Sequence, residues 1–217
     1  MRVVEPEWLD TLPPGDPRAL RSRRDLARLN AIMRNAGIVA SELGDAPPTR
    51  IAEIGAGDGG FAVRLAACFS EGGGEFVLVD RLPAPAPPPC GGWRFEAATR
   101  EVFEWLGDPG TGHFDAIVAN LFLHHFDDTS LERLLGAIAR RTRRFVACEP
   151  RRSALALAGS HLVGLVGCND VTRHDAVASV RAGFSHREIS ARWKAPGWRL
   201  EERPRGLFSH LFTAIGE

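Results

Sequence analysis

The spacing of apolar residues changes along the chain and divides it into three regions. From Asp16 to Leu43 they recur about every 3.6 residues opposite a face rich in arginine, which predicts an amphipathic helix. From residue 50 to residue 149, short apolar runs alternate with helical stretches, which predicts a parallel sheet with helices on both faces. Residues 151–194 look helical again, and two strand-like runs about a Pro-Arg-Gly turn then predict an antiparallel hairpin.

Five apolar runs form the expected strands of the central region. They are RIAEIG (50–55), EFVLVD (75–80), WRFEAA (93–98), FDAIVANLFL (114–123) and RFVACE (144–149). A short helix is expected from Glu101 to Leu106, and a Thr129–Glu132 capping box is expected to open another. Residues 81–92 are rich in proline, which cannot donate to a strand ladder, so they predict a surface loop.

Composition narrows the class of protein. The formal net charge is +0, which argues against a general nucleic-acid or anionic-membrane binder. The four cysteines form no C-x-x-C pair, so we expect reduced thiols in the cytoplasm and no metal site. The acidic, proline-rich start is unlike a signal peptide, and no apolar run approaches the roughly 18 residues of a membrane span.

The segment IAEIGAGDGGFAVRLA (51–66) predicts a strand, a glycine-rich turn and a helix. Such a turn gathers backbone N–H groups at a helix N-terminus, where a ligand can approach closely. Gly55, Gly57 and Gly60 match the G-x-G-x-x-G pattern of dinucleotide-binding proteins, whereas Gly55, Gly57 and Gly59 match a G-x-G-x-G pattern. The glycines alone therefore leave the cofactor open.

Two acidic residues beside this turn bear on the choice. Glu53 lies inside the apolar strand, and a buried carboxylate is costly without a partner. The ammonium of a methionine group could supply that partner, directly or through water, whereas a pyrophosphate could not. Asp80 ends the next strand and can accept hydrogen bonds from both ribose hydroxyls, which favours an adenosine-type cofactor of either kind.

On these residues the chain resembles the class I S-adenosylmethionine-dependent methyltransferases. The segments that carry the resemblance are EIGAGDG, VLVD, EVFEWL, DAIVANLFLHHF and FVACEP. The resemblance implies a Rossmann-like α/β fold, with a mostly parallel seven-stranded sheet in the order 3-2-1-4-5-7-6. It further implies a helical N-terminal lid segment (residues 1–48) and a methyltransferase domain (49–217) with a helical substrate insert at about 151–194.

The resemblance also assigns residues to S-adenosylmethionine. They are Glu53, Gly55, Ala56, Gly57 and Gly59 for the methionine and ribose, Asp80 with Arg81 for the ribose hydroxyls, Glu101 and Val102 for the adenine, and Asn120 and Leu121 beside the methyl donor. Two departures stand out. The acid after the third strand is Glu101 where the family more often has Asp, and the fourth motif reads NLFL, not the N-P-P-Y type that grips a planar amide or amine.

Three histidines are the candidate catalytic residues. His124 and His125 follow the fourth strand at its carboxyl end, where open α/β sheets bind ligands. A histidine there can accept the proton of a phenol as the methyl bond forms, although either residue could simply cap the turn. His174 lies in the helical insert and faces the acceptor, or is a solvated residue beside Asp175.

These features predict a methyltransferase for a small, mainly apolar acceptor, most simply a phenolic or polyketide-type hydroxyl. C-methylation of an electron-rich or quinone-like ring would need the same pocket and base. An NAD(P)-dependent oxidoreductase shares the glycine pattern and Asp80, but the chain has no Tyr for a Tyr-x-x-x-Lys pair. A non-catalytic cofactor-binding partner subunit is a third alternative. We expect no nucleic-acid partner, and a homodimer is the assembly to test.

Overall fold

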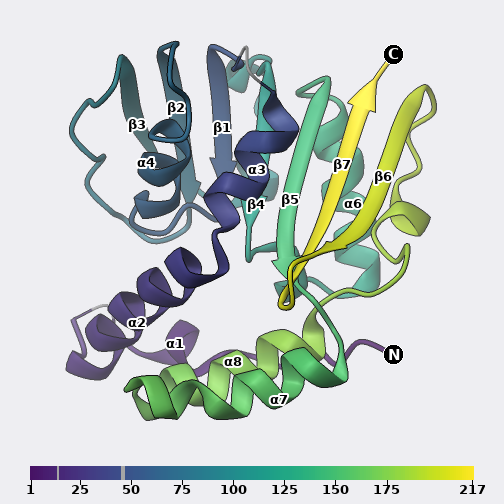
Figure 1. Cartoon of the computed structure of the whole chain (residues 1–217). Coiled ribbons are helices and arrows are strands. Elements are labelled where there is room, and N and C mark those ends of the chain that lie inside the picture. The colour runs from purple at the N-terminus through teal and green to yellow at the C-terminus, as the bar shows by residue number, and fades with distance from the viewer. Residues whose placement is uncertain (14, 45–46) are drawn as a thin grey trace.

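The computed structural model describes residues 1–13, 15–44 and 47–217. Its centre is a seven-stranded sheet in the order β3-β2-β1-β4-β5-β7-β6, which confirms the predicted order (Figure 1). β1 to β5 pair in parallel, whereas β7 runs antiparallel to both β5 and β6. The strands are β1 (Arg50–Ile54), β2 (Gly74–Asp80), β3 (Trp93–Thr99), β4 (Ala116–Asn120), β5 (Arg144–Pro150), β6 (Trp198–Arg205) and β7 (Ser209–Gly216).

Helices cover both faces of this sheet and the edge at which its parallel strands end (Figure 1). The α-helices are α1 (Trp8–Thr11), α2 (Pro17–Met33), α3 (Asn35–Leu43), α4 (Gly60–Ala66), α5 (Val102–Gly107), α6 (Asp128–Ala139), α7 (Ala154–Leu162) and α8 (Asp170–Ala182). Four short 3-10 turns are η1 (Pro109–Thr111), η2 (Leu123–His125), η3 (Val163–Val166) and η4 (Ser190–Arg192).

Two hydrophobic cores hold the helices to the sheet. On one face, α5 and α6 bury Trp105, Leu131 and Leu135 against the strands. On the other face, α3 and α4 bury Val39 and Leu65. Strands covered on both sides read as nearly continuous apolar runs, and every residue of β4 is indeed buried.

The remaining helices, α1, α2, α7 and α8, lie together at the carboxyl edge of the parallel strands (Figure 1). α8 packs against the other three and so forms the centre of this layer. Ligands bind at this edge in open α/β sheets, so the helical layer faces the place where a site is expected. None of the helices in residues 1–13, 15–44 and 47–217 combines the length and apolar character that a bilayer span needs.

Two predicted helices differ from the structure in detail. The single helix expected from Asp16 to Leu43 breaks at Arg34, whose left-handed backbone (φ 58°) separates α2 from α3. This break lets α3 pack on the sheet while α2 stays with the carboxyl-edge layer. α6 begins before the expected Thr129 because the Asp127 carboxylate caps it, accepting a 2.8 Å hydrogen bond from the Ser130 N–H.

The connection between β2 and β3 contains no helix. Parallel strands are usually joined through a helix, but here residues 81–92 form the proline-rich loop that the sequence predicts. The loop returns across the carboxyl edge, and Pro87 lies against the glycine turn that follows β1. It therefore forms part of the site described next.

Candidate active site

The turn between β1 and α4 has three glycines in the left-handed region, at φ 70° for Gly55, 56° for Gly57 and 74° for Gly59. Neighbouring side chains explain two of them. A Cβ on Gly55 would lie 2.2 Å from Phe122, and one on Gly59 would lie 2.7 Å from Leu78. A Cβ on Gly57 would meet no described atom within 4 Å. Gly57 is therefore the glycine that faces open space, where a ligand can approach the backbone.

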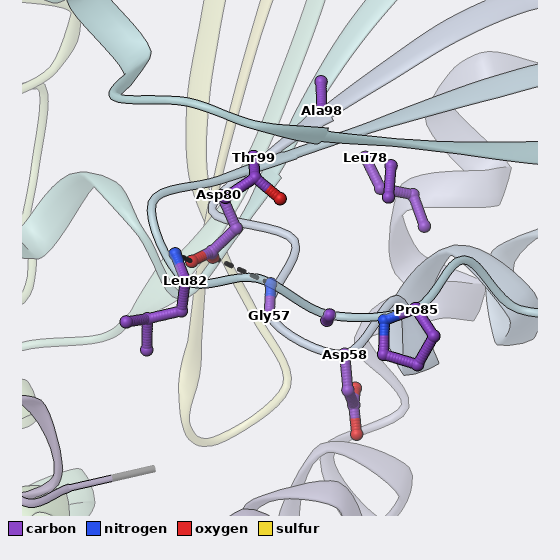
Figure 2. A pocket seen from close by; sticks show the side chains of 10 residues that line it. Gly57, Asp58, Leu78, Asp80, Leu82, Pro85, Ala98 and Thr99 are labelled. Carbon is purple, nitrogen blue, oxygen red and sulfur yellow. Dashed lines mark hydrogen bonds between the residues drawn. The ribbon is translucent and has the colours of Figure 1, made fainter.

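A small, shallow hollow opens beside Gly57 (Figure 2). Its lining residues come from the glycine turn, the ends of β2 and β3, and the proline-rich loop. They are Gly57, Asp58, Leu78, Asp80, Leu82, Ala84, Pro85, Ala97, Ala98 and Thr99. Small apolar side chains form most of the wall, and two carboxylates add polar groups, a combination typical of a small-molecule site.

Asp80 connects the hollow to the turn. One carboxylate oxygen accepts a 2.9 Å hydrogen bond from the Gly57 N–H, and the other accepts a 2.9 Å bond from the Leu82 N–H. Figure 2 shows both bonds. They orient the carboxylate and leave each oxygen a further lone pair for a ligand hydroxyl. Arg81 instead forms a 3.1 Å ion pair with Asp10 of α1.

Glu53 lies on β1, two residues before Gly55, and is only 1% exposed. Its Oε2 atom accepts no hydrogen bond from any described residue. Burial, together with the nearby negative charges of Asp58 and Asp80, raises the pKa of this carboxyl well above its usual value. A cation delivered to this position by a ligand would find a carboxylate with a free oxygen.

The residues expected beside the methyl donor end β4. Asn120 is buried, and its Oδ1 atom accepts a 2.9 Å hydrogen bond from the Nδ2 of Asn35 on α3. Leu121 has a left-handed backbone (φ 54°), which is costly for a residue with a branched side chain. Such strain is commonly kept where it positions functional groups. It turns the chain directly into η2 and the histidine pair.

The residues expected at the adenine lie at the start of α5. The Glu101 carboxylate caps this helix, with Oε2 accepting from the Phe103 and Glu104 N–H groups at 2.7 and 3.2 Å. Val102 is buried in the core. Neither residue lines the hollow, whereas Gly57 and Asp80 do. The structure therefore brings together only part of the predicted cofactor set around that space.

His124 is held between two carboxylates. Its Nδ1 atom lies 2.9 Å from Oε2 of the fully buried Glu149, and its Nε2 atom lies 3.4 Å from Oε1 of Glu7. The other oxygen of Glu149 accepts from the Phe122 and Leu123 N–H groups at 3.0 and 2.8 Å. Glu149 on β5 thus fixes both the turn after β4 and the His124 ring.

The two neighbouring histidines differ in proton affinity. Burial lowers the pKa of His124, but the hydrogen bonds that its ring donates to Glu149 and Glu7 outweigh burial and raise that pKa to about 9. Burial and the adjacent His124 charge lower the pKa of His125. The ring centroids lie 4.2 Å apart, so the imidazolium of one disfavours a second charge on the other. At neutral pH His124 is therefore charged and His125 neutral.

His174 lies on α8 and stacks on Trp8, with ring centroids 4.0 Å apart and planes at 10°. Its Nδ1 atom is 2.9 Å from Asp175, which also accepts hydrogen bonds from the Trp8 and Leu9 N–H groups at 2.8 and 3.0 Å. The ring therefore holds the N-terminal segment in place. No contact joins it to His124 or His125 in the described part of the chain.

Three residues of the N-terminal segment contact the predicted site residues but were not predicted from the sequence. Glu7 reaches His124, Trp8 stacks on His174, and Asp10 lies between Arg81 and His125, whose Nδ1 atom is 3.9 Å from Asp10 Oδ2. The motif EPEWLD has no periodicity or ligand spacing that would have drawn attention to it. Only the fold places it beside residues more than a hundred positions away.

Structural comparison identifies the fold. An O-methyltransferase family protein from Burkholderia thailandensis matches 94% of this chain at a TM-score of 0.61 and 18% identity. The plantazolicin methyltransferase in complex with S-adenosylhomocysteine matches 94% at 0.63 and 8% identity. Mitomycin 7-O-methyltransferase matches 96% at 0.61 and 21% identity.

The coverage of the matched proteins differs. This chain spans 61% of the Burkholderia protein and 60% of the mitomycin enzyme, but 92% of the plantazolicin methyltransferase. No protein-family model and no curated protein sequence matches the chain. The strand order, the glycine turn and these similarities agree on one architecture. The chain has the fold of the class I S-adenosylmethionine-dependent methyltransferases.

Proposed function

We propose that this protein transfers a methyl group from S-adenosylmethionine to a small, mainly apolar acceptor, at a phenolic or polyketide-type hydroxyl. The main evidence for S-adenosylmethionine as the cofactor is Glu53, a buried carboxyl with a free Oε2 beside the glycine turn. The methionine ammonium supplies the missing positive charge, whereas the phosphates of a dinucleotide would add repulsion. The similar solved structures that contain S-adenosylhomocysteine support the same choice.

Two groups of residues would hold the two ends of the cofactor. Asp80 and the Gly57 backbone would take the ribose, and the base would lie beside them at the ends of β2 and β3. Glu53 and the turn would take the methionine end, and Asn120 and Leu121 would lie beside the sulfonium. When bound, the cofactor supplies an already activated methyl carbon, so the protein's main tasks are to align the acceptor and to exclude water.

We assign the general base to His125. It is neutral at neutral pH because its own pKa is lowered, and 30% of its side chain is exposed. It can therefore accept the acceptor's hydroxyl proton as the new bond forms. His124, at 3% exposure and with both ring nitrogens engaged by carboxylates, instead supplies a fixed positive charge beside it. His174 is not assigned to proton removal, because its ring stacks on Trp8 and contacts Asp175.

The apolar acceptor class rests on the carboxyl-edge layer. α7 reads ALALAGSHL, and we place the acceptor at the carboxyl edge of the sheet, beside the layer formed by α7, α8 and α2. A zero net charge also does not favour a polyanionic substrate.

Calorimetric titration with S-adenosylhomocysteine, NAD⁺ and NADP⁺ tests the cofactor. Micromolar binding of the first ligand alone is expected, and binding of a nicotinamide cofactor alone would overturn the proposal. Labelled S-adenosylmethionine with a panel of phenols then tests the reaction. A product methylated only at nitrogen or carboxylate would contradict it, and a ring-methylated product would select C-methylation instead.

Two variants test the base. His125→Ala should lower turnover by about 10²- to 10⁴-fold with little change in S-adenosylhomocysteine affinity. His186→Ala, at a histidine of the α8–η4 connection, is the matched control. Full turnover in His125→Ala would remove His125 from this role. We also expect dialysis against a chelator to leave turnover unchanged, and a loss restored by Zn²⁺ would show a metal requirement.

A further inference from the structure

The first twelve residues form a strap across the carboxyl edge of the sheet. At one end, the Arg2 side chain is only 4% exposed and its guanidinium donates to the backbone oxygens of Ala182 and Phe126 at 2.8 and 3.1 Å. The same guanidinium lies over the Phe184 ring, 4.1 Å from its centroid. At the other end, α1 is fixed to α8 through Asp175. The strap is thus anchored on both sides of Glu7.

Glu7 is the strap residue that enters the histidine site. Its side chain is 12% exposed, and its Oε1 atom both accepts a hydrogen bond from the Ser179 hydroxyl and lies 3.4 Å from His124 Nε2. One nitrogen or oxygen atom from each of Glu7, His124 and His125 lies within 4.8 Å of the others. The strap therefore contributes a carboxylate to a cluster otherwise built from β5 and the turn after β4.

We propose that Glu7 is a positioning residue for methyl transfer, which fixes the His124 ring from the side opposite Glu149 and thereby holds His125 against the acceptor. The proposal rests on the proposed function, in which His125 removes the acceptor proton. Glu149 restrains only the Nδ1 side of His124. Glu7 contacts the Nε2 side at 3.4 Å, so both ring nitrogens of His124 have a carboxylate partner.

Glu7 also balances the charge of the cluster. The groups that face His125 are His124, Glu7, Asp10 and Glu149, and the Arg2 guanidinium donates to the His124 carbonyl at 3.3 Å. Removing one carboxylate from this set reduces the affinity of the imidazole pair for protons. Both proton losses of the pair then move to lower pH, whichever ring carries the proton.

Glu7→Gln tests the proposal because it preserves the shape of the side chain and removes its charge. We expect turnover to fall about 10- to 100-fold, with the affinity for S-adenosylhomocysteine unchanged. Both limbs of the pH–rate profile should move to lower pH. Ser179→Ala, which removes the anchor of Glu7 and no charge, should lower turnover without moving the profile. Glu5→Gln, at an exposed glutamate of the same strap, should change neither quantity.

A second measurement separates this proposal from the methyltransferase proposal. Titration of the ligand-free protein, followed by NMR of the imidazole signals, needs no substrate and no turnover. Lower imidazole pKa values in Glu7→Gln than in wild type would support the role of Glu7 even if no acceptor is methylated. Unchanged imidazole titration, or a Glu7→Gln enzyme with the wild-type rate and profile, would overturn it.

Discussion

At the scale of single residues, Glu53 shows a conflict between stability and binding. Its carboxyl is buried on β1 with one oxygen unpaired, and its pKa is raised. A group whose pKa is raised by folding stabilises the protein fully below its unfolded value, near 4.5, and loses this contribution as pH rises through the folded value. The ligand-free protein therefore loses stability by keeping a carboxylate here.

Glu53→Gln should preserve or raise the stability of the ligand-free protein and weaken its binding of the cofactor. In urea unfolding at pH 8, the ligand-free variant should be at least as stable as wild type because it has no charge to bury. Its affinity for S-adenosylhomocysteine should fall by roughly tenfold or more, as expected for the loss of a charged hydrogen bond of about 1.5–3 kcal/mol. A variant that binds the ligand as tightly as wild type would show that Glu53 does not face the methionine ammonium.

The Glu7–His124 pair predicts a pH window for stability. The contribution of His124 is complete below its unfolded value of 6.5 and is lost as pH rises through about 9. The pKa of Glu7 is lowered to about 2, chiefly by hydrogen bonding to His124 against its own burial, so its contribution is complete above 4.5 and is lost as pH falls toward 2. The pair therefore stabilises most between about pH 4.5 and 6.5.

Urea unfolding between pH 6.5 and 9.5 checks this window. The free energy of unfolding of wild type should fall by about 3 kcal/mol more than that of His124→Gln over this range. Comparison with the variant cancels the slopes of other titrating groups. Parallel curves for the two proteins would mean that His124 gains no protons on folding.

Sequence reasoning reached the residues whose motifs are local. Asp80 and the glycines follow a strand at fixed spacing, so their position beside the turn could be predicted. The sequence showed Glu149 only as an acidic residue at the end of a strand. It could not predict that the Glu149 carboxylate accepts hydrogen bonds from three successive N–H groups in the turn after β4. Glu7 could not be found at all, because its partner lies 117 residues away and no local pattern encodes that contact.

At the scale of elements, the strands were predictable and the helix ends were not. Strands buried on both faces leave apolar runs that are easy to recognise. The break at Arg34 leaves no such trace, because the apolar stripe continues through it while the two halves pack on different partners. The break depends on where α3 must meet the sheet, which is a tertiary requirement.

α1 is a four-residue helix whose stability depends on α8. The carboxylate of Asp175 accepts both free N–H groups at its start, and an isolated helix of this length would not persist. Asp175→Ala should release α1, with amide exchange in residues 7–12 faster by at least tenfold and the sheet amides unchanged. Asp170→Ala, at an exposed carboxylate of the same helix, is the control. Protection of residues 7–12 in Asp175→Ala would contradict this anchoring.

At the scale of the whole molecule, the hollow and the histidine cluster are joined by one ion pair. Arg81 follows Asp80 of the hollow, and its partner Asp10 belongs to the strap that carries Glu7. A ligand that orders the loop after β2 should therefore also favour the docked strap. This link needs no movement of the sheet, because every member lies at its carboxyl edge.

Ligand binding should accordingly stabilise the whole chain. At 100 times its dissociation constant, S-adenosylhomocysteine should add about 2.7 kcal/mol, or roughly 5–10 °C in Tm for a chain of this size. Differential scanning fluorimetry measures the shift, with NAD⁺ at the same concentration as the control. An equal shift with NAD⁺, or none with either ligand, would argue against the proposed cofactor.

The strap also has a consequence for how the protein folds. Its anchors pair Arg2 with Ala182 and Glu7 with Ser179, at sequence separations of 180 and 172 residues. During synthesis the strap leaves the ribosome well before α8, so its docking surface does not exist until α8 has been made. Contacts of such separation form late, because the loop between them must close first. The strap, although made before α8, is thus expected to be among the last segments to reach its native place, so the histidine cluster is completed late in folding.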